Sequence, residues 1–110
     1  MLLFSKVFAK TYNNDAVLFL QTIQQQAPHA RLVCAWGADG GYALETDDTL
    51  CYNPAYPPHQ IIDTLGAGDT FNAGIIDSLC CKKNLTTALN HACQLAGKKC
   101  GQVGFKNLIY

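Results

Sequence analysis

The chain has 110 residues, of which 49% are hydrophobic and 15% are charged, and its eight basic and eight acidic residues give a formal net charge of zero. This composition is apolar enough to fold around one small core and too poor in charge for a disordered chain. Because the basic residues are scattered, the sequence excludes both the basic stripe of a nucleic-acid-binding protein and the basic patch of a membrane-binding one.

The sequence also lacks the apolar segments that target a chain to membranes. No apolar run approaches the roughly 18 to 20 residues of a membrane-spanning helix. The apolar start at Met1–Phe4 is soon interrupted by Lys6 and lacks the longer core and cleavage site of a signal peptide. We therefore expect a soluble, cytoplasmic protein.

The cysteines and histidines indicate no disulfide framework or zinc site. The cysteines lie within apolar, periodic segments, which favours buried free thiols over disulfides. None of them has the paired spacing of zinc ligands. The histidines, His29, His59 and His91, have no partners at catalytic spacing. The six cysteines are Cys34, Cys51, Cys80, Cys81, Cys93 and Cys100.

The first half of the chain alternates a helix with predicted strands. Apolar spacing predicts a helix over residues 15–26, capped by Asn14 or Asp15 and ended before Pro28. The apolar run 31–36 is typical of a buried parallel strand. After a glycine-containing turn at 37–41, alternating residues up to 46 and the segment 49–52 predict a hairpin.

The second half is predicted to hold two helices. Three prolines make 53–59 an extended connector, after which 60–63 could pair briefly. A buried helix should run from about Ala67 to Cys81, and a second from an Asn84 cap to near Cys100, with Gly101 left-handed. This order fits the trailing half of an α/β sheet domain. We therefore expect missing chain upstream, and exposed apolar area around strand 31–36 that favours association.

The segment 63–74, Asp-Thr-Leu-Gly-Ala-Gly-Asp-Thr-Phe-Asn-Ala-Gly, carries the chemistry. Its small residues open directly into a helix, whose unpaired N–H groups can hold an anion. Asp69 places a carboxylate beside that anion site. A general base next to a phosphate site indicates phosphoryl transfer to a hydroxyl. The alternative is structural, with Gly66–Gly68 forming a tight turn and Asp69 capping the helix.

Two other phosphate-binding motifs do not fit this segment. The Walker loop requires a lysine followed by serine or threonine after its last glycine, where this chain has Asp69 and Thr70. The dinucleotide fingerprint requires a small residue three positions after Gly68, where Phe71 stands.

The string 63–71 resembles the C-terminal signature of the ribokinase-like PfkB carbohydrate kinases. Segments 4–6, 32–36, 93–101 and 104–105 are similar to the ketohexokinase branch of that family. The resemblance spans essentially the whole chain but only about the last third of an ordinary member. It implies that residues 1–110 are the C-terminal nucleotide-binding and catalytic portion of a three-layer α/β/α domain, without the N-terminal half and the β-sheet lid.

The resemblance also implies roles for individual residues. Asp69 matches the catalytic base, and Gly66, Ala67 and Gly68 match the amides that neutralise the transferring phosphoryl group. Asp63 matches a residue near a monovalent-cation site; alternatively it only orders the loop. The further nucleotide-binding positions implied are Lys6, Ala38, Gly40, Cys93 and Cys100.

Two functional hypotheses follow. The first is an ATP-dependent kinase that uses Mg²⁺, and K⁺ at the cation site, to convert fructose to fructose 1-phosphate, with homodimerisation of the full-length enzyme through the lid. Because positioning the sugar supplies much of the rate, the chain alone should have little activity. The second is a non-catalytic remnant that binds at most a nucleotide or a partner.

Overall fold

The computed structural model describes residues 1–58, 60–62 and 66–101 of the chain. Its centre is a four-stranded sheet in the order β1 (Leu2–Phe4), β2 (Leu32–Ala35), β3 (Gly41–Leu44) and β4 (Leu50–Asn53). Strand β1 pairs parallel to β2, whereas the β2–β3 and β3–β4 pairs are antiparallel. The sheet is therefore mixed.

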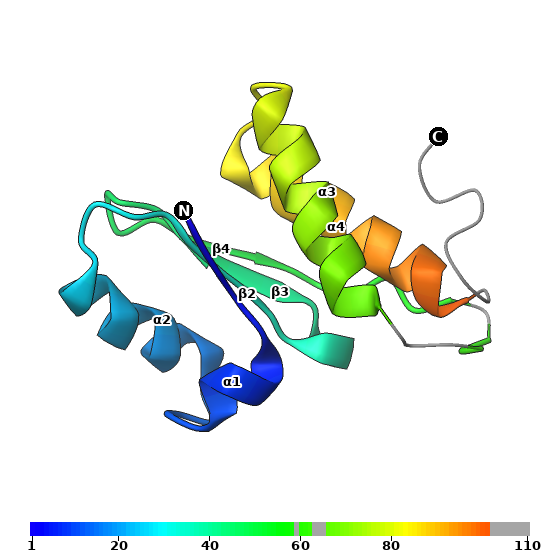
Figure 1. The fold of residues 1–110 in the computed structure, drawn as a ribbon, viewed down its shortest axis with the longest axis horizontal. Coiled ribbons are helices and arrows are strands. Elements are labelled where there is room, and N and C mark those ends of the chain that lie inside the picture. Colours follow the sequence, from blue (N-terminus) through cyan, green and yellow to red (C-terminus); the bar gives the residue numbers. More distant parts are fainter. Residues whose placement is uncertain (59, 63–65, 102–110) are drawn as a thin grey trace.

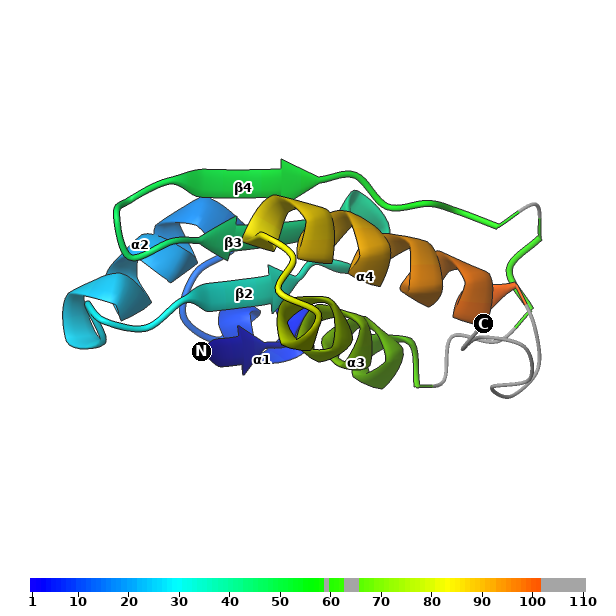
Figure 2. The ribbon, with the colours of Figure 1, turned by 90° about the horizontal axis from the view of Figure 1, so that it is seen from above.

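Helices cover both faces of the sheet (Figures 1 and 2). On one face lie α1 (Lys6–Lys10) and α2 (Ala16–Gln26); on the other lie α3 (Ala67–Cys80) and α4 (Leu85–Cys100). In β2, Leu32 and Cys34 pack with the first pair of helices, whereas Val33 packs with the second. Because successive side chains of a strand point to opposite faces, a strand covered on both sides must be continuously apolar.

The structure confirms the predicted helices. Asp15 caps α2, its Oδ1 accepting hydrogen bonds from the amides of Val17 and Leu18 at 2.9 and 3.2 Å. Asn84 caps α4 through the amide of Thr87 at 2.8 Å. The prediction for Gly101 is wrong: this residue follows α4 with φ −89° and does not adopt the left-handed conformation.

The predicted hairpin is confirmed as β3 and β4, and residues 54–58 form the expected connector without helix or strand. The expected pairing near residue 60 is limited to one backbone hydrogen bond from Ile62 to the Cys100 carbonyl, at 2.7 Å.

The expectation of uncovered apolar area around strand 31–36 is wrong. Strand β2 lies between β1 and β3, and Leu32, Val33 and Cys34 are fully buried. The covering strand, β1, has only three residues, too few for a recognisable pattern. Exposed apolar side chains lie instead on and after α1, where Val7 is 81% and Tyr12 67% exposed.

All six cysteines are free. Cys34, Cys51 and Cys93 are buried as predicted, and Cys100 is partly exposed. The prediction is wrong for Cys80 and Cys81, which are exposed where α3 ends. The apolar pattern of α3 extends to Cys80, but Cys80 lies on the same exposed face of the helix as Ala73 and Ile76.

Candidate active site

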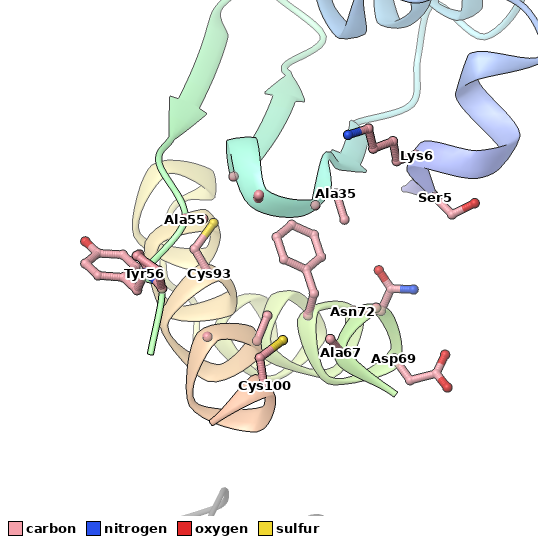
Figure 3. A pocket seen from close by; sticks show the side chains of 18 of the residues that line it. Ser5, Lys6, Ala35, Ala55, Tyr56, Ala67, Asp69, Asn72, Cys93 and Cys100 are labelled. Carbon is pink, nitrogen blue, oxygen red and sulfur yellow. The ribbon is translucent and has the colours of Figure 1, made fainter. Parts of the chain in front are cut away.

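A pocket of about 460 Å³ lies where α3 begins and α4 ends (Figure 3). Five segments distant in the sequence form its walls: the β1–α1 junction, the turn after β2, the connector after β4, the start of α3 and the last turns of α4. The fold thus brings residues from positions 4 to 100 to one site.

The start of α3 presents free hydrogen-bond donors to this pocket. Gly66 occupies the N-cap in a left-handed conformation, with φ 80° and no side-chain cap. The first helical bond runs from the Thr70 amide to the Gly66 carbonyl, at 2.9 Å. In the described part of the chain, nothing accepts a hydrogen bond from the amides of Ala67, Gly68 and Asp69. These amides and the helix dipole can therefore hold an anion.

Gly68 and Asp69 lie on the open side of the helix start. A Cβ atom at Gly68 would meet no atom within 4 Å, so glycine is not required there by internal packing. Asp69 is exposed and lines the pocket, and its carboxylate makes no hydrogen bond within the described residues. Because Gly66 holds the N-cap position and Asp69 lies three residues into the helix, the structure gives no support to the helix-cap alternative.

Lys6 lines the same pocket from the β1–α1 junction. It is half-buried, and its Nζ lies 5.9 Å from the centroid of the Trp36 ring. Cation–π attraction to the indole holds the side chain at this wall of the pocket. The pocket therefore has a cation opposite the donors of α3.

The turn after β2 brings Ala38 and Gly40 into the wall. Gly40 has φ 101°, and a Cβ atom there would collide with the carbonyl oxygen of Asn53. Tyr52 further fixes the turn, its hydroxyl donating to the Asp39 carbonyl at 2.9 Å. The protein's own backbone therefore requires glycine at position 40, independently of any nucleotide.

The opposite end of the pocket is apolar. Cys93 and Cys100 line it from α4, facing Tyr56 and two prolines of the connector. Burial raises the pKa of the Cys93 thiol from 9.0 to about 11, so this thiol is neutral at physiological pH. This apolar slot ends at the hydrogen-bond donors of α3. Such a pocket suits a ligand with a flat base and a phosphate chain.

Most of the predicted site residues meet in this pocket: Lys6, Ala38, Gly40, Ala67, Gly68, Asp69, Cys93 and Cys100. Gly66 adjoins it as the N-cap of α3. Asp63 and His59 lie outside the described residues, which contain no cluster of three His, Cys, Asp or Glu side chains that could hold a metal.

The remaining histidines lie away from the pocket lining. His29 is exposed, and His91 on α4 lies 3.7 Å from the Asp77 carboxylate on α3. The described helices include none long and apolar enough to cross a membrane.

Three polar pocket residues were missed by the sequence analysis: Ser5, Tyr56 and Asn72. For Asn72 a signal existed, because a residue three positions after Asp69 lies on the same side of a helix. For Ser5 and Tyr56 no local pattern pointed to the site.

Residues 6–109 match the model of the pfkB family carbohydrate kinases. The chain belongs to this family. Within it, the chain is 50% identical over 80 residues to mouse ketohexokinase, covering 73% of this chain and 27% of the relative. It is 40% identical over 75 residues to fructosamine kinase FrlD of Bacillus subtilis, covering 68% and 26%.

Solved structures agree with the family's fold. A protein of Agrobacterium tumefaciens assigned as a ribokinase superimposes with a TM-score of 0.85 at 22% identity, covering 93% of this chain and 34% of that one. Ribokinase from Cryptococcus neoformans var. grubii in complex with ADP gives 0.75 at 25% identity, covering 81% and 30%. The pfkB chain thus has a mixed α/β fold and spans between a quarter and about a third of these relatives' lengths.

Proposed function

We propose that residues 1–110 supply the nucleotide-binding and catalytic part of an ATP-dependent sugar kinase. The adenine base occupies the apolar slot between α4 and the connector. The phosphates extend towards the start of α3, where Asp69 acts as general base on the acceptor hydroxyl. In the same proposal, the sugar-binding half and lid of the complete kinase lie outside these residues.

The uncapped start of α3, with Asp69 beside it in a pocket that also holds Lys6, carries this proposal. Free amides and an ammonium group are complementary to phosphate oxygens. A carboxylate would repel the same phosphate. The position of Asp69 is explained by its role as a general base, which takes up a proton during the reaction.

The proposed transfer exchanges one phosphorus–oxygen bond for another. The acceptor hydroxyl oxygen forms a bond to the γ-phosphorus, the bond between that phosphorus and the bridging oxygen of ADP breaks, and the hydroxyl proton passes to Asp69. The amides of Ala67 and Gly68 and the ammonium of Lys6 stabilise negative charge on the phosphoryl oxygens.

The acceptor is proposed to be fructose, with fructose 1-phosphate as product. This choice is supported by the 50% identity to a ketohexokinase, while the similarity to a fructosamine kinase keeps other ketose derivatives as test substrates. The proposal includes a homodimer of the complete enzyme and, because all six thiols are free, a cytoplasmic location.

Mg²⁺ is proposed to enter with the nucleotide. Magnesium commonly binds through substrate phosphates, water and one or two carboxylates. Asp69 is the carboxylate of the pocket lining nearest the start of α3, so the donor set fits a nucleotide-borne ion better than a resident one. The proposed K⁺ site at Asp63 lies outside the described residues.

NMR titration of the chain with Mg·ADP tests the proposal. The amide signals of Ala67, Gly68 and Asp69 should shift, together with those of Cys93 and Gly97 at the base end, while Gln21 on distant α2 should not. Saturable shifts at both of these groups, with Gln21 unchanged, support the assignment. Unchanged signals at the start of α3 with saturating ADP would contradict it.

A further inference from the structure

Asn72 lines the pocket but has no role in the reaction proposed above. It is half-buried on α3, three residues after Asp69. Figure 3 shows the two side chains projecting on the same side of the helix, with Lys6 and Ser5 across the opening. The carboxamide makes no hydrogen bond within the described residues.

The direction of helical side chains brings this carboxamide towards the reacting group. Residues three apart are one turn, roughly 5.4 Å, from each other along a helix, and side chains tilt towards the helix N-terminus. Asn72 therefore reaches back over the turn that carries Asp69, which is the turn with the free amides.

The surrounding groups define what Asn72 would bind. The amides of α3 and the ammonium of Lys6 are hydrogen-bond donors that line the same pocket as the Asp69 carboxylate. A transferring phosphoryl group presents three oxygens, all acceptors. The carboxamide can add a hydrogen-bond donor without adding a charge beside Asp69.

We propose that Asn72 is a further substrate-contacting residue, whose side-chain N–H donates a hydrogen bond to the γ-phosphoryl group of the nucleoside triphosphate. This inference rests on the proposed function. It predicts that Asn72 distinguishes triphosphate from diphosphate, whereas the base slot and the remaining phosphates are bound without it.

Calorimetric titration of the 110-residue chain with Mg²⁺ and either β,γ-imido-ATP or ADP tests the inference. Asn72→Ala should weaken binding of the triphosphate analogue about tenfold, the ordinary contribution of one hydrogen bond, and that of ADP less than about twofold. Asn72→Asp conserves volume but replaces the donor by a negative charge, so it should weaken binding of the triphosphate analogue still further. Asn14→Ala, on the exposed turn before α2, is the matched control and should change neither affinity.

Equal losses for both ligands, or none for the triphosphate, would overturn the role of Asn72. Circular dichroism shows whether each variant is folded. If the alanine variant is unfolded, the isosteric Asn72→Asp provides the test in its place. If the unchanged chain binds neither nucleotide, the proposed function itself fails.

Discussion

The carbonyl oxygen of Tyr56 lies against Gly97, so close that a Cβ atom at position 97 would collide with it. Through this contact the connector after β4 rests on α4 and forms the outer wall of the apolar slot. The Ile62 amide adds a hydrogen bond to the Cys100 carbonyl at 2.7 Å. The slot therefore depends on the absence of a side chain at one position of α4.

Gly97→Ala should destabilise the fold and weaken nucleotide binding together. Overpacking typically costs about 1–3 kcal/mol, more than the ~1 kcal/mol that alanine gains over glycine in a helix. Urea unfolding should show the lower stability, and ADP titration the lower affinity, because the displaced connector no longer closes the slot. Unchanged stability would mean that the connector does not rest on Gly97 in solution.

Gly68→Ala should separate stability from binding. The added methyl group meets no protein atom within 4 Å, so the fold should be retained or stabilised by up to ~1 kcal/mol. Because the methyl group faces the proposed phosphate position, ADP and ATP should both bind more weakly. If calorimetry finds wild-type affinity in this variant, the start of α3 does not approach the phosphates.

Asp69→Asn should remove turnover and keep nucleotide affinity. The amide conserves size but cannot take the hydroxyl proton, and a positioned general base contributes about 10²- to 10⁴-fold to the rate. The measurement is kcat for fructose in an enzyme that joins this chain to the part of mouse ketohexokinase it does not match. Asp48→Asn, in the exposed hairpin turn, is the control. Near-normal turnover of Asp69→Asn would end the assignment of this carboxylate as the base.

The free thiols should differ sharply in reactivity. At pH 8, iodoacetamide should modify the exposed Cys80 and Cys81 first, whereas Cys34 and Cys93 should react only on unfolding. Burial raises the pKa of Cys34 to about 12 and that of Cys93 to about 11, so their thiolates are scarce in the folded chain. Mass spectrometry of the alkylated peptides gives the order; early labelling of Cys93 would indicate an open base slot.

The same pKa differences predict a loss of stability in alkali. In the unfolded chain these thiols ionise near 9.0, whereas in the folded chain they stay protonated to about 12 for Cys34 and about 11 for Cys93. Their contribution is therefore fully present below pH 9 and lost as the pH rises from 9 through the folded values. Urea unfolding across this range should show the decline, and Cys34→Ala should reduce its slope. An unchanged slope in that variant would contradict the contribution of Cys34.

The sequence by itself determined the elements whose signals are local. The Asp15 and Asn84 caps, the apolar run at 32–35 and the hairpin are encoded within a few residues of where they form. The string around Asp69 likewise located the helix start, because glycine permits the left-handed N-cap at Gly66, and its resemblance to a known signature located the family.

Only the tertiary structure decided what those elements do together. Strand β1 has three residues and is stable only by pairing with β2, so no periodicity could reveal it or the burial of β2 that it completes. Cys80 continues an apolar pattern, but packing puts it on the solvent-facing side of α3, with Ala73 and Ile76. Ser5, Tyr56 and Asn72 enter the pocket because three separate segments converge on it. Such convergence is a property of packing, which depends on contacts between residues far apart in the chain.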